Sequence, residues 1–286
     1  MTVSQIRQEV QKQKELPTLS SNVERILSAC GDHDIKQSEL AEVLGESPTI
    51  AARLLGLANS AFFGQQGRVH SLPHAISVLG MVTVRSVAAG LALSGVFKTG
   101  DCPHFQADRH WAASVMTALM ASQLNSSIQA DVRPPNDSVY MAGLLHSIGL
   151  LALVFLHPEA MDRAFMSYDA DRARGLAGHI QAELGVDHYQ AGVWLGSKWH
   201  LPREILLVIE HHGDSAYRGE HWPLVRLEGL CVDWAGQIVD GVDDLQADSE
   251  AAASLGLTTA VVERVWSRMQ EKLAGIRDLA ALFAPG

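Results

Sequence analysis

The sequence predicts an all-α fold, and three observations support this. Apolar residues recur at spacings of i, i+3, i+4 and i+7 along nearly the whole chain, which is the period of a helix with one buried face. The alternation of apolar and polar residues that is typical of a half-buried strand is rare. The chain of 286 residues is 47% hydrophobic, which is enough to fill a core. We therefore expect at least about 60% helix and almost no sheet.

Short, closely connected helices are predicted for the N-terminal part of the chain. Apolar stripes cover residues 23–27, 40–44 and 50–57. Serine and proline at 47–48, and again within 71–73, mark helix beginnings, because serine caps free amide groups and proline is accepted in the first turn. We therefore expect several short helices in this region.

Residues 98–108 are the best candidate for a seam, meaning a boundary between two helical parts of the chain. They place Gly, Pro and charged residues between two strongly helical regions. Beyond the seam, the pattern predicts one long helix over 111–124 and a loop over 133–137. Residues 138–155 predict a buried helical segment that is interrupted near Gly149. The last fifty residues predict amphipathic helices that close the bundle.

The charge balance argues against broad nucleic-acid binding. The chain has 22 Lys and Arg against 32 Asp and Glu, for a net charge of −10. Such a surface repels a phosphate backbone over most of its area. A local basic patch is the exception that this balance leaves open.

The sequence favours the cytoplasm and gives no sign of a membrane anchor. Cys30, Cys102 and Cys231 are far apart and odd in number, which argues against a disulfide framework and fits a reducing compartment. The polar N-terminus lacks the apolar core of a secretory signal. The longest apolar stretch, residues 141–156, is shorter than the roughly 20 residues that span a bilayer, so we interpret it as a core helix.

Several of the 13 histidines fall in or beside apolar helical segments. His146 lies in such a segment, where an imidazole is usually hydrogen-bonded to a neighbour. His188 begins a predicted helix, while His211 and His212 lie near the end of another, where the helix dipole favours a cation. Asp233 lies among apolar residues and needs a partner, a cation or an amphipathic edge. Each residue alone has a structural explanation.

Together, these segments carry a resemblance. Similarity to the HD superfamily of metal-dependent phosphohydrolases is carried by AGLLHSIG, LGVDHYQAGVWLGSKWHLPREIL and IEHHG, in that order. Similarity to the HD-related output domain (HDOD) family is carried by LPTLSSNVERIL, SPTIAARLLGLANSAFFG and HSLPHAISVLGMVTVRSVAAGLAL. The resemblance extends from about residue 16 to about residue 233.

The resemblance implies the domain organisation, with an HD-domain-like helical bundle preceded by a smaller N-terminal helical bundle. Residues 1–15 are expected to form an N-terminal helix or tail, residues 16–240 the HDOD domain, and residues 241–286 the closing helices. Within the HDOD domain, residues 16–97 correspond to the N-terminal subdomain and residues 108–240 to the HD-like subdomain.

The chain departs from the HD pattern at two positions. Hydrolytic members of the superfamily hold metal with an upstream His, an adjacent His-Asp pair and a distal Asp. Here Ala113 stands near the upstream position and Ser147 follows His146, so one imidazole and the bridging carboxylate are missing. His110, one turn from Ser114 on the same predicted helix, is a poor replacement. A neutral serine cannot bridge two divalent ions as a carboxylate does.

We therefore interpret the cleft as vestigial, with no catalytic residue and no cofactor. Seven residues are predicted to lie in it: Ala113, His146, Ser147, His188, His211, His212 and Asp233. The alternative is a single zinc or iron ion, which suits imidazole and carboxylate ligands. Its ligands would come from His146, His188, His211, His212 and Asp233.

The function that the resemblance implies is that of a non-catalytic bacterial signal-transduction or regulatory module, acting through protein–protein interaction or ligand sensing. The expected partners are signalling proteins in trans, such as response regulators or cyclic-dinucleotide enzymes. The alternative function is a degenerate or single-metal HD-type phosphohydrolase that acts on a nucleotide or cyclic dinucleotide. The sequence leaves the partner, the pathway and the oligomeric state open, and a homo-oligomer is compatible with it.

Overall fold

A computed structural model of the chain describes residues 3–11, 20–32, 34–60, 67–95, 97, 99–245 and 248–283. The protein is 71% helical, and the described residues contain no strand. The all-α prediction and the expected helix content are therefore confirmed.

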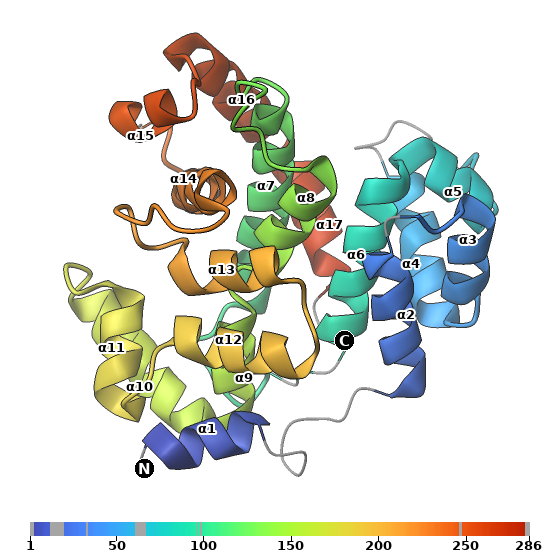
Figure 1. The fold of residues 1–286 in the computed structure, drawn as a ribbon. Coiled ribbons are helices and arrows are strands. Elements are labelled where there is room, and N and C mark those ends of the chain that lie inside the picture. Colours follow the sequence, from blue (N-terminus) through green and yellow to red (C-terminus); the bar gives the residue numbers. More distant parts are fainter. Residues whose placement is uncertain are drawn as a thin grey trace.

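The described residues of the N-terminal part form six helices, of which α2 to α6 pack on one another (Figure 1). Their bounds are α1 Val3–Gln11, α2 Ser21–Gly31, α3 Gln37–Gly45, α4 Pro48–Ala58, α5 Leu72–Leu79 and α6 Met81–Ser94. Helix α1 lies apart from this group and packs against α12 (His188–Lys198), where the Arg7 guanidinium lies 5.8 Å from the centre of the Trp194 ring. The segment 1–15 therefore contains a helix that is docked on the C-terminal part of the chain.

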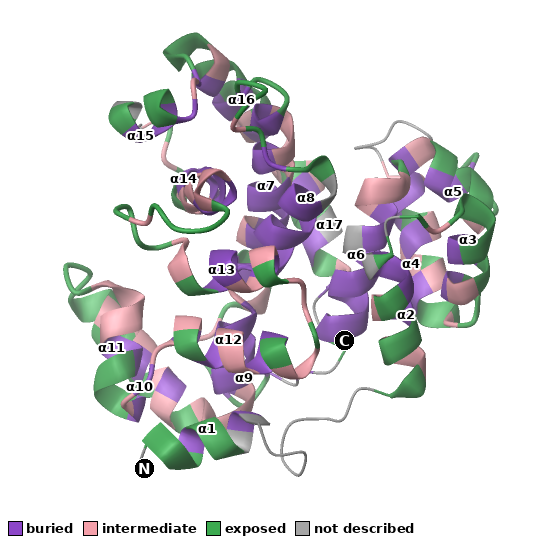
Figure 2. Cartoon of the chain, viewed as in Figure 1, coloured by how far each residue is buried: buried purple, intermediate pink, exposed green. Residues whose placement is uncertain are grey.

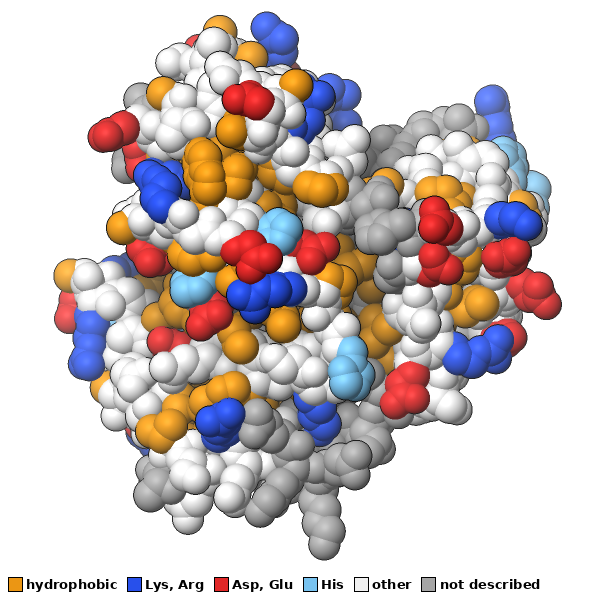
Figure 3. All heavy atoms as spheres, viewed as in Figure 1, with side chains coloured by type: hydrophobic (Ala, Val, Ile, Leu, Met, Phe, Trp, Pro, Cys, Tyr) orange, Lys and Arg blue, Asp and Glu red, His pale blue; other side chains and the backbone are white. Residues whose placement is uncertain are grey.

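The described residues between α6 and the next helix contain no helix, and that helix begins at Ala107, inside the range 98–108 that was predicted to separate the two helical regions. The helices beyond it are α7 Ala107–Asn125, α8 Asn136–Leu145, α9 Ile148–Leu156, α10 Pro158–Ala170, α11 Gly175–Leu184, α12 His188–Lys198, α13 Arg203–His211, α14 Trp222–Val239, α15 Ser249–Ser254, α16 Thr259–Glu271 and α17 Leu273–Ala281. On the face drawn in Figure 3, basic side chains are interspersed with acidic ones.

Helix α7 is the central element of the larger group and packs against α8, α14, α16 and α17 (Figures 1 and 2). Its buried residues lie on every side of the helix, which is the behaviour of a helix enclosed by its neighbours. Because α7 is fixed on several sides, it provides a rigid wall for the site described below.

The most apolar part of the chain is the segment Ser138–Leu156, which contains α8 and α9. It is long and apolar enough to cross a membrane by length and composition, but 83% of its most apolar window is buried inside the protein. The pair α5 and α6 passes the same test together, with a bend of 117° between the two helices. The predicted interruption near Gly149 lies slightly earlier, at His146 and Ser147, because α8 ends at Leu145 and α9 begins at Ile148.

Residues at and beyond the end of α17 connect the two groups of helices. The Phe283 side chain is fully buried and stacks on Trp111 of α7, with ring centroids 4.8 Å apart and ring planes at 18°. A Cβ atom at Gly90 of α6 would lie 2.7 Å from the Phe283 ring, so this ring packs closely against α6. The Arg53 guanidinium of α4 donates a hydrogen bond to the Leu282 carbonyl oxygen.

Candidate functional site

His146 lies directly after α8, at the break between the two apolar helices. Its side chain is 6% exposed. The Nδ1 atom lies 2.7 Å from the Gly143 carbonyl oxygen, and because a carbonyl oxygen can only accept, Nδ1 carries the proton. The Nε2 atom of the neutral ring is therefore an acceptor.

His188 and His212 come from two other helices. Asp187 caps α12 by accepting a hydrogen bond from the Gln190 amide at 2.9 Å, which fixes His188 as the first helical residue, as predicted. His212 follows α13, and its Nδ1 donates to the Val208 carbonyl oxygen at 2.8 Å. The His212 ring centroid lies 5.0 Å from that of His146. The three histidines are linked through Tyr189, whose ring is 4.1 Å from that of His188 and 5.0 Å from that of His212.

His110, on α7, is the fourth member of this histidine cluster, defined as His110, His146, His188 and His212. Burial lowers the pKa of His110, His188 and His212 to about 3 and that of His146 to about 4. Repulsion among the rings is a smaller contribution to each of these lowered pKa values. All four imidazoles are therefore neutral at pH 7.

Of the five predicted metal ligands, His211 and Asp233 lie outside the cluster. The His211 ring stacks on Tyr217 at 4.2 Å, and its Nε2 lies 3.6 Å from a Glu210 carboxylate oxygen. Asp233 is exposed on α14, and partial desolvation together with the charge of Asp248 raises its pKa. The amphipathic edge of α14 therefore accounts for Asp233, and the buried partner that its sequence context suggested is not needed.

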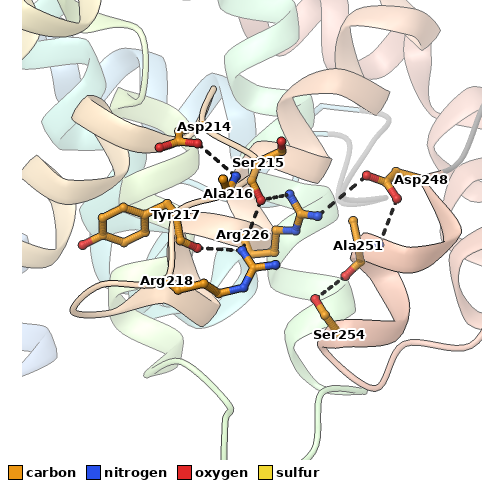
Figure 4. Close-up of polar contacts among 9 residues, drawn as sticks. All are labelled: Asp214, Ser215, Ala216, Tyr217, Arg218, Arg226, Asp248, Ala251 and Ser254. Carbon is orange, nitrogen blue, oxygen red and sulfur yellow. Dashed lines mark hydrogen bonds and ion pairs between the residues drawn. The ribbon is translucent and has the colours of Figure 1, made fainter.

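The segment that follows His212 is held by two arginines (Figure 4). The Arg226 guanidinium donates to the Ser215 carbonyl oxygen at 3.0 Å and lies 3.7 Å from a carboxylate oxygen of Asp248. Arg218 donates to the carbonyl oxygens of Ser215 and Tyr217 at 3.1 and 2.7 Å. These contacts fix the segment that carries Tyr217, and with it the ring on which His211 stacks.

An open groove of about 1230 Å³ lies beside the cluster, between α7, the junction of α8 and α9, α10, α14 and α17. Ala113 and Ser147, the two positions where the sequence departs from the HD pattern, line this groove together with His110 and His146. The sequence placed His110 near Ala113, but its place in the histidine cluster was not predicted. Helix periodicity alone does not show which neighbouring helix a ring contacts.

Two buried polar residues were missed. Glu228 on α14 is 0% exposed, neither of its carboxylate oxygens has a hydrogen-bond partner, and burial raises its pKa well above the usual range. Ser114 is 1% exposed, and its hydroxyl also has no partner. Glu228 lies in the same apolar run as Asp233. A carboxylate among apolar residues is unusual, and this argument was applied to Asp233, whereas Glu228 is the acid that is buried.

The described residues do not fit a metal centre of the HD type. Among them, no group of three His, Cys, Asp or Glu side chains is arranged to hold an ion. The four clustered imidazoles have no carboxylate among them, and burial raises the pKa of Glu228 well above its usual range, which disfavours the anionic form that binds metal. The proposed single zinc or iron ion therefore finds no suitable donor set in the described part of the chain.

Comparison with known proteins gives the same family as the sequence motifs. The HDOD domain model matches residues 16–215. A Marinobacter aquaeolei VT8 structure with a suggested role in signal transduction is 28% identical, with a TM-score of 0.82, and covers 94% of this chain. An HDOD domain protein of unknown function from Geobacter sulfurreducens (21% identity, TM-score 0.74, 96% of each chain) shares the fold. So does a suggested phosphohydrolase from Shewanella amazonensis SB2B (21% identity, TM-score 0.74, 98% of each chain).

Two of the relatives are longer than this chain. The chain spans 60% of the Marinobacter structure and 40% of an uncharacterized Treponema pallidum (strain Nichols) protein, to which it is 23% identical over 214 residues, or 74% of this chain. The family match covers well over half of this sequence, and the fold agrees with it. The chain therefore belongs to the HDOD family.

Proposed function

We propose that the chain is a non-catalytic regulatory module of bacterial signal transduction that acts in the cytoplasm. One observation carries the proposal. Ala113 and Ser147 line the groove where the superfamily pattern calls for metal ligands, and the imidazoles beside them are neutral and buried.

The loss of these two ligands removes the means of catalysis. Metal ions in such sites lower the pKa of a bound water molecule and neutralise charge that develops on the phosphoryl oxygens. Loss of a residue that only supports a metal ligand already costs about 10- to 100-fold in metal affinity or activity, so loss of two ligands costs more.

Signalling proteins in trans, such as response regulators or enzymes of cyclic-dinucleotide metabolism, are the proposed partners. Support comes from the family and from the Marinobacter relative with its suggested role in signal transduction. The module would then act by binding, with its scaffold of buried helices presenting a surface or a groove.

The test is a hydrolysis assay of the full chain with Mn²⁺, Fe²⁺ or Zn²⁺ added, on a phosphomonoester, on nucleotides and on cyclic dinucleotides. We expect no metal-dependent turnover. The matched control is the double variant Ala113→His with Ser147→Asp, which restores both missing ligands and should increase metal uptake measured by elemental analysis. Turnover by the unmodified chain that requires metal and disappears in His146→Ala would refute the proposal and favour a phosphohydrolase.

A further inference from the structure

The lining of the groove contains polar groups that can make further hydrogen bonds, and one of them is a buried hydroxyl without a partner. Ser114 is 1% exposed, and its hydroxyl has no partner. His146 donates its Nδ1 proton to the Gly143 carbonyl oxygen, so Nε2 is the acceptor atom of this groove-lining ring. Since buried polar groups are normally paired, these atoms indicate that something with both donors and acceptors completes the floor.

One side of the groove is aromatic. Phe105 and Phe165 lie with ring centroids 5.9 Å apart and planes at 37°, and the Phe105 ring is 5.5 Å from that of His110. Tyr168 also lines the groove. Aromatic faces at this spacing favour the packing of a flat ring, and the contact of Phe105 with His110 brings them next to the histidine cluster.

The charges of the groove cancel. Its lining contains three arginines and three aspartates, and the histidines at its floor are neutral. Arg109 is held by two hydrogen bonds to Asp240, at 2.8 and 2.7 Å, and Arg172 pairs with Asp169 at 3.0 Å. The third arginine, Arg277, donates to the Val239 carbonyl oxygen at 3.3 Å. A phosphate group therefore meets no net positive charge here.

We infer that this groove binds an uncharged, planar heterocycle that carries both hydrogen-bond donors and acceptors. The ring packs against Phe105 and Phe165, and its polar edge meets the Ser114 hydroxyl and the His146 Nε2 atom. The inference rests on the proposed non-catalytic function and specifies what the groove recognises. A pocket with an apolar wall and a few convergent polar groups is typical of small-molecule recognition.

The test is a ligand-observed NMR screen of the full chain at pH 7.5 against uncharged heterocyclic fragments, with free purine and pyrimidine bases included. Several fragments should receive saturation from the protein and should displace one another. Ser114→Ala, which removes only the hydroxyl, should weaken binding about 3- to 10-fold, as expected for one hydrogen bond. Phe165→Leu should weaken the same fragments. Ser127→Ala, at an exposed serine after α7, is the matched control and should leave binding unchanged.

Three outcomes would overturn the inference: no fragment binds, binding is unchanged in both groove variants, or a nucleoside 5′-phosphate binds at least 10-fold more tightly than its nucleoside. Folding of each variant is checked by circular dichroism, and the Phe165 variant keeps the test valid if the Ser114 variant does not fold. If the groove binds no heterocycle, the NMR screen is negative and the hydrolysis assay shows no turnover. If the proposed non-catalytic function is wrong, the hydrolysis assay shows metal-dependent turnover, so the two failures are distinguishable.

Discussion

His146 and His212 lie edge to face, with ring centroids 5.0 Å apart and ring planes at 83°. Each ring donates its Nδ1 proton to a backbone carbonyl oxygen within its own turn. Protonation of either ring would place a charge in a buried site beside the other ring. The pair is therefore stable only while both rings are neutral.

This relationship predicts that acid destabilises the fold. The pKa of each clustered histidine is lowered to about 3 or 4, so between these values and about 6.5 the unfolded chain binds protons that the folded chain does not. Stability contributed by the cluster is present above pH 6.5 and is lost as pH falls, by up to about 1.4 kcal/mol per pH unit for each histidine. Urea unfolding at pH 7.5, 6.5 and 5.5 measures this slope, which should be shallower in His212→Gln. Equal slopes in the two proteins would contradict the prediction.

Glu228 predicts an opposite effect at higher pH. Its raised pKa means that the folded chain keeps a proton that the unfolded chain releases above about pH 4.5, so its contribution to stability falls as pH rises toward the folded pKa. We expect Glu228→Met to raise the free energy of unfolding at pH 8 by about 1 to 3 kcal/mol, because it removes an unpaired buried polar group. Glu228→Gln, which stays polar, should gain less. A loss of stability in the Met variant at pH 8 would show that the carboxyl has a partner.

At Gly149, where α9 packs against α12, we expect that no side chain larger than hydrogen is tolerated. A Cβ atom there would lie 2.7 Å from the Gly192 Cα and closer still to the His188 carbonyl oxygen, and backbone atoms cannot move aside as side chains do. Gly149→Ala should therefore destabilise the protein by at least about 3 kcal/mol in thermal or urea unfolding. The matched control is Gly56→Ala in α4, where no atom lies within 4 Å, and it should stabilise by about 0.5 to 1 kcal/mol.

Phe283 is predicted to be a major contact between the two groups of helices. Phe283→Ala removes its stack on Trp111 and its packing against α6, at a cost of about 3 to 5 kcal/mol in the free energy of unfolding. Phe283→Leu, which retains most of the apolar volume, should cost less. Similar losses in the two variants would show that the ring stack, rather than buried volume, provides the stabilisation.

Local chemistry made part of this structure predictable. The start of α12 at His188 follows from the Asp187 cap, and the position of His211 and His212 follows from the apolar stripe of α13, because both signals act within one or two turns. The family motifs then predicted that His146, His188 and His212, on different helices, would lie near one another. The domain boundaries and the role of the cleft remain predictions.

Long-range packing was not predictable in the same way. The stack of Phe283 on Trp111 and the approach of His110 to the cluster depend on which helix faces meet, and local spacing does not contain that information. The choice between Asp233 and Glu228 depends on the rotation of α14, which placed the first acid outside and the second inside. An apolar run shows that a helix is buried. It is a weaker guide to which face of that helix is buried most deeply.

The apolar segment Ser138–Leu156 has a consequence for the protein during its synthesis. It is covered by α7, which is made before it, and by α12, α13 and α14, which are made after it. At about 5 to 20 residues per second, the roughly 80 residues up to the end of α14 take on the order of 5 to 15 seconds to emerge. Until then the newly made segment lacks the part of its cover that α12, α13 and α14 provide, and it presents apolar surface to the cell. We therefore expect nascent chains that end within α10 or α11 to associate with chaperones more strongly than chains that include α14.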